Sequence, residues 1–97
     1  MGEFVYLIRP VRQGFIETMT EEESGIMKRH FDYLNALLSE EKLILAGPCL
    51  DGAFGIVVFR EETLDAAREI MVNDPAVLHG LMSADLHPYR VSLMQSR

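Results

Sequence analysis

Cysteine, tryptophan and basic residues are scarce in this sequence. The 97 residues include 1 Cys, no Trp and 4 Pro. A single cysteine excludes an internal disulfide and a thiolate metal cage, so the fold needs neither an oxidising compartment nor zinc. The apolar neighbours of Cys49 predict a buried thiol. Because 48% of the residues are hydrophobic and Pro and Gly are few, the chain can bury a core and is not a disordered tail.

Long hydrophobic runs and a positive net charge are also absent. No run approaches the roughly 20 apolar residues that cross a bilayer, and residues 1–4 lack the features of a secretion signal. The 15 Asp and Glu outnumber the 9 Lys and Arg, and the net charge of −6 would repel a phosphate backbone. We therefore expect one cytoplasmic domain over residues 1–97, without a membrane or a nucleic acid as partner.

The remaining pattern predicts strand, helix, strand, strand, helix and strand. The helix that begins after Thr20 has the clearest start, because Thr20 and Glu23 have the spacing of a capping box. Asp51 and Gly52 read as a two-residue hairpin turn. A bend is expected at Gly47-Pro48, and a loop over 12–19. The expected strands are 3–9, 43–50, 53–59 and 85–94, and the expected helices run from residue 20 to about 42 and from residue 63 to 73.

This order is the ferredoxin-like βαββαβ pattern of the α+β class, an antiparallel four-stranded sheet with two helices on one face. The other face should be polar if it meets water. The first strand is instead apolar on both sides, because Phe4 and Tyr6 alternate with Val5 and Leu7. We therefore predict that the second face packs against another copy of the chain, as a homodimer. Pro88 places the last strand at an edge or marks a bulge early in it.

Sequence motifs for common chemistries are missing. The chain has no phosphate-binding glycine loop, no Gly-x-Ser-x-Gly elbow and no His-Glu-x-x-His. His79 and His87 lack the spacing of metal ligands and are expected to be surface or hydrogen-bonded residues. No metal and no cofactor is expected.

His30 is the most informative polar residue, since it lies one helical turn from both Ile26 and Leu34 on or beside the stripe that faces the sheet. A polar ring there needs a partner. A backbone carbonyl at the edge of the core is one interpretation. Asp74 offers another, because an acid at the end of a helix is mildly unfavourable unless something else gains from it. If the helix ends converge, Asp74 can hold one nitrogen of His30 and leave the other to move a proton.

Four further residues are candidates for contact with a ligand. Arg9 and Arg29 can anchor an anion, although each is also explained as a solvated surface group. Gly47 and Pro48 can let a ligand approach closely, or simply bend the strand.

Three stretches together resemble the YciI-like (YCII-related) family. They are residues 30–34, which begin with His30, residues 43–48, which end in Gly-Pro, and Asp74-Pro75 with Gly80 after it. The resemblance covers nearly the whole chain. It implies a dimeric α/β barrel and a pocket that holds a His–Asp pair, here His30 and Asp74. One branch of the family removes chloride from a chlorinated hydroxyhydroquinone, and related dimeric barrels include muconolactone isomerases.

The sequence departs from some members at Ala76, where they have an aromatic residue, and this difference predicts a larger or more open pocket. The leading hypothesis is a metal-independent enzyme that uses His30 as general acid/base, oriented by Asp74. The reaction would be elimination, dehydrochlorination or isomerisation of a small cyclic or aromatic substrate. The alternatives are a non-catalytic domain that binds a small ligand, and a His–Asp pair that serves only the fold. The expected partners are a second copy and a small organic ligand, an anionic one included.

Overall fold

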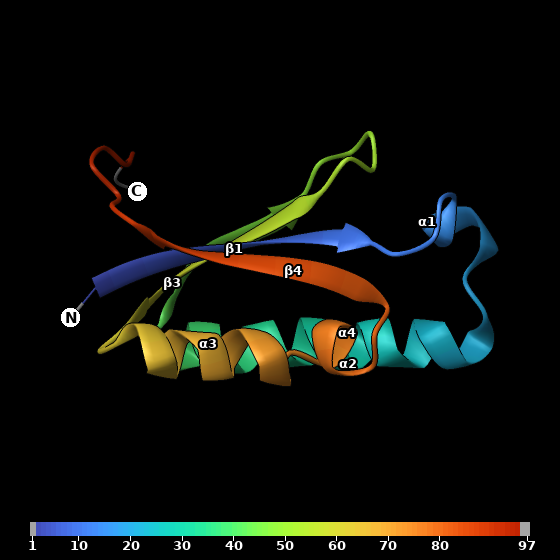
Figure 1. The fold of residues 1–97 in the computed structure, drawn as a ribbon, viewed down its shortest axis with the longest axis horizontal. Helices are drawn as coiled ribbons and strands as arrows, with labels where there is room; N and C mark the ends of the chain where they lie inside the picture. Colours follow the sequence, from blue (N-terminus) through green and yellow to red (C-terminus); the bar gives the residue numbers. More distant parts are fainter. Residues whose placement is uncertain (1, 96–97) are drawn as a thin grey trace.

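The computed structural model describes residues 2–95 and confirms the predicted order of the main elements. The elements are β1 (Gly2–Pro10), α1 (Phe15–Thr18), α2 (Glu21–Ser39), β2 (Leu43–Pro48), β3 (Gly55–Glu61), α3 (Leu64–Asn73), α4 (Pro75–Leu78) and β4 (Met82–Tyr89). The fold is α+β and ferredoxin-like, as expected. Helices α2, α3 and α4 lie together below the sheet in Figure 1, and α1 lies beyond its end.

The sheet is antiparallel throughout, with the strand order β2-β3-β1-β4. Its register pairs Phe4 with Phe59 and Tyr6 with Val57. These side chains form the core between the sheet and the helices. Tyr6 and Phe59 are fully buried, and their rings meet edge to face at 5.8 Å. Strand β4 is an edge strand, which explains why Pro88 is tolerated in it.

Local sequence signals set the starts of both long helices. The Thr20 side chain accepts a hydrogen bond from the Glu23 N–H, and the Glu23 carboxylate accepts one from the Thr20 N–H, as the capping box predicts. Thr63 caps α3 with a single bond, because its side-chain oxygen accepts a hydrogen bond from the N–H of Ala66.

The end of α2 falls at Ser39, before the expected residue 42. The N–H groups of Glu41 and Lys42 return to the carbonyls of Leu38 and Leu37, both at 3.0 Å, in the pattern of a Schellman cap. Glu41 takes the left-handed conformation, with φ of 62°, that glycine usually supplies at such a cap. This end of α2 could not be predicted from the sequence, because no glycine stands at the cap position.

Two connections also differ from the prediction. Residues 12–19 contain the short helix α1, in which Phe15 is buried. Gly14 precedes the helix and has a left-handed backbone conformation. The hairpin between β2 and β3 is wider than an Asp51-Gly52 turn, because the N–H of Cys49 bonds to the carbonyl of Phe54 at 2.7 Å. The irregularity of β2 lies between Leu43 and Leu45, not at Gly47-Pro48.

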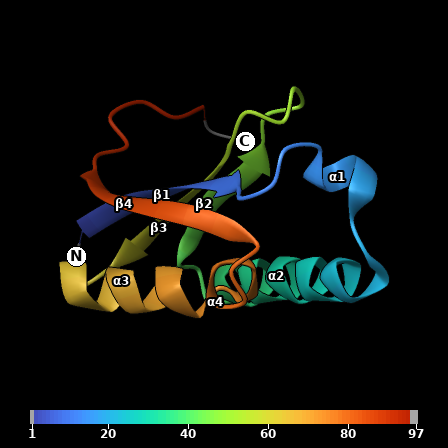
Figure 2. The same ribbon diagram turned by 45° about the vertical axis from the view of Figure 1, so that its right-hand side comes forward.

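Strand β4 is shifted toward the N-terminus relative to the predicted 85–94. Its only neighbour is β1, whose pairing runs from Glu3 opposite Tyr89 to Pro10 opposite Met82. Residues 90–95 therefore have no strand to pair with in the described part of the chain. They turn away above the face of the sheet opposite the helices (Figure 2), where the N–H of Val91 bonds to the Glu3 carboxylate at 2.8 Å.

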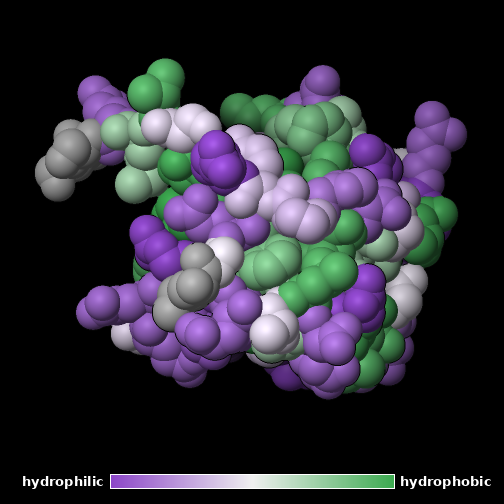
Figure 3. Space-filling view, turned by 60° about the vertical axis from the view of Figure 1, so that its left-hand side comes forward, coloured by the Kyte–Doolittle hydropathy of each residue, from purple (hydrophilic) through white to green (hydrophobic). Residues whose placement is uncertain are grey.

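The face of the sheet opposite the helices is apolar at its centre. The register places Val5 opposite Val58 and Leu7 opposite Ile56 on this face, which we call the outer face. Other large apolar side chains are exposed elsewhere, and in the view of Figure 3 hydrophobic residues form a green area between hydrophilic ones. Within residues 2–95 no helix is long and apolar enough to span a membrane. The cytoplasmic location stays a prediction.

Candidate functional site

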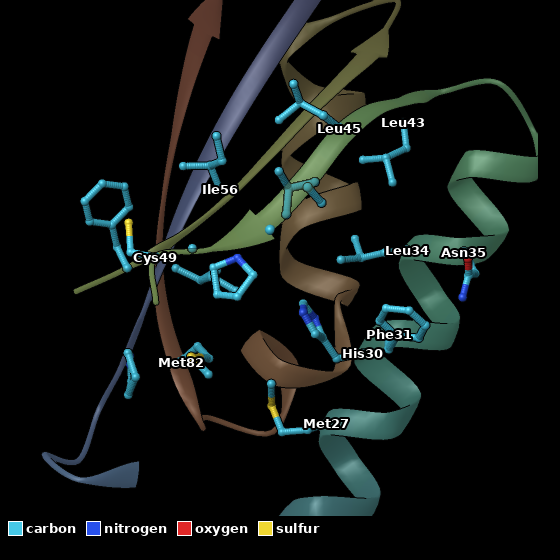
Figure 4. Close-up of a pocket in the computed structure, with 18 of the residues that line it drawn as sticks. Met27, His30, Phe31, Leu34, Asn35, Leu43, Leu45, Cys49, Ile56 and Met82 are labelled. Carbon is cyan, nitrogen blue, oxygen red and sulfur yellow. The ribbon is translucent and has the colours of Figure 1, made fainter. Parts of the chain in front are cut away.

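A cavity of about 690 Å³ opens between α2 and the β2–β3 hairpin (Figure 4). Its wall is mainly apolar, and only three of its side chains are polar: His30, Asn35 and Cys49. Asn35 is exposed on α2. In Figure 4 the ring of His30 projects from α2 toward the strands, so that an imidazole lies within the hydrophobic wall.

His30 is held by Asp74, whose side chain comes from the junction of α3 and α4. Nδ1 of His30 lies 2.6 Å from Oδ1 of Asp74. The His30 side chain is 12% exposed and that of Asp74 is fully buried. Ile26 and Leu34, one turn before and after His30, are buried against the core and fix the face of α2 that carries the ring. The structure therefore brings together the two residues that the sequence singled out.

Asp74 is fully satisfied by hydrogen bonds. Its Oδ1 also accepts the N–H of Ala76 at 3.0 Å, and its Oδ2 accepts the hydroxyl of Tyr6 at 2.6 Å. Asp74 ends α3, where an acid is unfavourable, but it also caps the N-terminus of α4, with Pro75 in the first turn. The second role offsets the dipole penalty considered from the sequence. Three donors on one buried carboxylate hold it rigidly.

The bond to Asp74 decides which nitrogen of His30 is free. A carboxylate only accepts hydrogen bonds, so Nδ1 carries a hydrogen and Nε2 of the neutral ring has a lone pair. Nε2 has no hydrogen-bond partner among residues 2–95, and no buried side-chain nitrogen or oxygen there lacks one. Nε2 is therefore accessible, and the cavity that His30 lines is where a ligand can reach it.

Two tyrosines surround the buried carboxylate. Burial raises the pKa of Tyr6 first of all, and the negative charge of Asp74 and the hydrogen bond to it raise it further. Tyr33 donates to the carbonyl of Ile70 at 2.7 Å. Its pKa is raised to about 12 by burial, and then by the charges of Asp74 and Glu40. Both hydroxyls therefore remain hydrogen-bond donors at neutral pH.

Sequence reasoning did not identify Tyr6 as part of the site. It was placed only in the apolar alternation of the first strand. The available signal was chemical, since a tyrosine among inward-facing core residues needs a partner for its hydroxyl. The partner lies 68 positions away in the chain, and only the tertiary fold identifies it as Asp74.

The four ligand-contact candidates divide into two groups. Gly47 and Pro48 line the cavity, and Arg9 and Arg29 do not. Arg9 points to the outer face, where its guanidinium pairs with Asp85 at 3.2 Å. Arg29 is exposed on α2, because neighbouring residues on a helix point about 100° apart and His30 faces inward. Neither arginine offers an anion anchor in the cavity wall.

Two further expectations concern Ala76 and Cys49. Ala76 is fully buried and does not line the cavity, and a larger or more open pocket because of Ala76 stays a prediction. The expectation of a buried thiol at Cys49 is wrong. Cys49 is only partly buried, and its neighbour Leu50 is fully exposed at the hairpin. His79 and His87 are exposed, as expected. Among residues 2–95 no three His, Cys, Asp or Glu side chains gather closely enough to hold a metal ion.

Comparison with known proteins agrees with this architecture. The fold is similar to the solved structure of 5-chloro-2-hydroxyhydroquinone dehydrochlorinase from Burkholderia phenoliruptrix in complex with 2,5-dihydroxybenzoquinone. The TM-score is 0.67 with 20% sequence identity, covering 90% of this chain and 93% of that chain. No curated protein matches the chain. The YCII-related domain family matches residues 3–86, and the chain therefore belongs to that family.

Proposed function

We propose that the protein is an enzyme in which His30 acts as general acid/base on a cyclic or aromatic organic substrate. One observation carries this proposal. A fully buried carboxylate holds Nδ1 of His30 at 2.6 Å, while Nε2 is free at the cavity. This arrangement fixes the tautomer and the orientation of a base in a hydrophobic site, which is what proton transfer to a bound molecule requires.

The reaction class is proton abstraction with elimination or isomerisation. In the elimination, a chlorinated hydroquinone reacts as its diketo tautomer, in which the chlorine-bearing carbon and its neighbour are tetrahedral. Nε2 of His30 takes a proton from that neighbour, and the C–H electron pair forms the ring double bond of the quinone as chloride leaves. The imidazolium then returns its proton to water. In an isomerisation it returns the proton to a different carbon of the same molecule, and nothing leaves.

Asp74 and Tyr6 act as positioning residues in this proposal. Asp74 stabilises the imidazolium that forms when His30 takes the proton. Tyr6 holds Oδ2 of the carboxylate, so that Oδ1 stays directed at His30. Nε2 of His30 is the atom that takes and returns the proton.

Dehydrochlorination is the favoured reaction within this class. A solved structure of the same fold bears the name of a dehydrochlorinase that acts on 5-chloro-2-hydroxyhydroquinone. At 20% identity this likeness shows the fold, and it supports the reaction only as a starting point for a substrate screen.

The test uses the full chain with chlorinated hydroquinones, including 5-chloro-2-hydroxyhydroquinone, under anaerobic conditions with chloride release as the readout. His30→Gln should lower turnover by about 100-fold or more, because the base is lost while the shape is nearly kept. Asp74→Asn retains a possible acceptor for Nδ1 but removes the charge, and it should also slow turnover. The matched control is His79→Gln, since His79 is exposed and outside the cavity. Full turnover in His30→Gln, or an equal loss in His79→Gln, would show that the role of His30 is wrong.

A substrate-independent readout accompanies the screen. Binding of hydroquinone, which is uncharged at neutral pH and has no chlorine to lose, should shift the imidazole NMR signals of His30 and leave those of His79 and His87 unchanged. A ligand that shifts the His30 signals without any turnover across the screen would support the non-catalytic binding domain instead.

We further propose that the protein forms a homodimer through the outer face. The apolar residues Val5, Leu7, Ile56 and Val58 lie together on the two central strands and face away from the helices. Val58 is already buried within one chain, and a second copy packed on this face would remove the partly exposed Val5, Leu7 and Ile56 from water. Ile56 also lines the cavity, so a partner packed on the outer face would border the cavity at this residue.

A further inference from the structure

The size of the cavity exceeds what one ring needs. An apolar cavity of about 150 Å³ is enough to bind benzene, and pockets of about 300 to 1,000 Å³ take molecules with the size of a drug. The cavity beside His30 measures about 690 Å³. A single six-membered ring at Nε2 would leave most of it without a packing partner.

Several of the side chains that line the cavity are apolar and exposed to solvent. Phe31 and Leu38 lie two turns apart on the same face of α2. Both line the cavity, and they are 65% and 53% exposed. Ile16 of α1 also lines it and is 61% exposed. A group of exposed large hydrophobic side chains around one opening is typical of a ligand-binding groove, and here such side chains border a cavity with a single imidazole in its wall.

The charges around the cavity disfavour the binding of an anionic ligand. Among residues 2–95 no Lys or Arg lines it. The ionisable group directly behind His30 is the buried carboxylate of Asp74, whose negative charge repels an anion that approaches Nε2. The net charge of the chain, −6, acts in the same direction.

We infer that the cavity takes an uncharged, largely apolar molecule with the size of two or more rings, which presents one hydroxyl or acidic C–H group to Nε2 of His30. The inference rests on the proposed function for the contact with His30. It narrows the substrate class to molecules larger than the single-ring hydroquinones with which the screen begins, and it replaces the anionic ligand for which Arg9 and Arg29 were candidates.

The experiment compares two fluorescent dyes with the same ring skeleton. N-phenyl-1-naphthylamine is uncharged, and 8-anilinonaphthalene-1-sulfonate adds one sulfonate to it. Fluorescence titration of the full chain should show that the uncharged dye binds about tenfold more tightly. It should also shift the imidazole NMR signals of His30.

Matched lysine variants locate the binding. Leu38→Lys places a cation at the cavity, and it should reduce the preference for the uncharged dye by about fivefold. Leu78→Lys is the control, because Leu78 is 62% exposed and does not line the cavity. Ile16→Lys provides a second cavity variant on another element. All three positions are more than half exposed, so the fold should tolerate the charge.

Three outcomes would overturn the inference. They are equal or tighter binding of the sulfonate dye, no binding of either dye, and the same response in the Leu38 and Leu78 variants. Dye binding does not require proton transfer, so His30→Gln should keep the preference for the uncharged dye. If it does so while turnover is also unchanged, the acid/base role of His30 fails and the ligand class stands. If turnover depends on His30 but the sulfonate dye wins, the ligand class fails alone.

Discussion

The hydroxyl of Tyr6 lies 2.6 Å from Oδ2 of Asp74, with both side chains fully buried. This bond ties the central strand β1 to the junction of α3 and α4. Because the other oxygen of the same carboxylate faces His30, the core of the sheet and the cavity share one polar group. A change at Tyr6 should therefore be felt both in stability and at His30.

Replacing Tyr6 with Phe should lower the free energy of unfolding by about 2 to 3 kcal/mol, because Oδ2 of a buried carboxylate loses its only side-chain donor. Urea unfolding followed by circular dichroism measures this loss. Tyr33→Phe is the control, since Tyr33 donates to the neutral carbonyl of Ile70, and it should cost about 1 kcal/mol. Equal losses in the two variants would mean that the charge of Asp74 adds nothing to the Tyr6 bond.

Stability at high pH should depend on the same tyrosine. The folded protein raises the pKa of Tyr6 above its ordinary value of 10.0. Its contribution is complete below pH 10 and is lost as the pH rises further, because the unfolded chain then releases the proton and the folded chain does not. Tyr33 adds a smaller loss of the same sign between pH 10 and about 12.

The measurement is urea unfolding between pH 9 and 11. The decline of the wild-type protein should be steeper than that of Tyr6→Phe by about 1.4 kcal/mol per pH unit above pH 10. Tyr89→Phe changes a half-exposed ring and should follow the wild-type curve. Parallel curves for the wild type and Tyr6→Phe would contradict the predicted linkage.

Local patterns in the sequence were sufficient for the main framework. Thr20 and Glu23 lie within one turn of each other, so the start of α2 could be read directly. The alternation in β1 likewise assigned Tyr6 and Val5 to opposite faces, as the register confirms. The position of His30 followed from the period of the helix.

The parts that could not be predicted depend on residues far apart in the chain. Helix α1 forms where Arg12 binds Glu23 and the Phe15 ring is buried, and no pattern within residues 12–19 encodes those contacts. Arg9 was a candidate to bind an anion, but its guanidinium is hydrogen-bonded to Asp85 of β4, which lies 76 positions later in the chain. The bond between His30 and Asp74 was conditional on two helix ends meeting, which spacing alone does not fix.

The ion pair at the start of α2 predicts a second pH dependence. The Arg12 guanidinium contacts both carboxylate oxygens of Glu23, at 2.9 and 3.0 Å. This hydrogen bonding, followed by that from the Thr20 N–H, lowers the pKa of Glu23 from 4.5 to about 2. A lowered pKa stabilises the fold above pH 4.5, and this stabilisation is lost as the pH falls toward 2.

Glu23→Gln should therefore be less stable than the wild type at neutral pH and should show a flatter decline between pH 4.5 and 2. The amide keeps an acceptor for the Thr20 N–H, so the variant removes the charge without removing the cap. Glu22→Gln, on the exposed side of the same turn, is the matched control and should behave as the wild type does. Acid unfolding followed by circular dichroism decides between them. A decline in Glu23→Gln as steep as in the control would refute the role of the ion pair.

The outer face provides a test of the proposed homodimer. Leu7 lies on the central strand β1, opposite Ile56 on one side and Asp85 on the other. Leu7→Lys should leave the isolated chain folded, because Leu7 is partly exposed there and Asp85 can receive the cation. In a dimer packed on this face the same charge would be buried and would separate the copies. Sedimentation at micromolar concentration should give twice the chain mass of 11.0 kDa for the wild type and for Leu78→Lys, and the chain mass for Leu7→Lys. A monomeric wild type, or a dimer that survives Leu7→Lys, would mean that the outer face is not the interface.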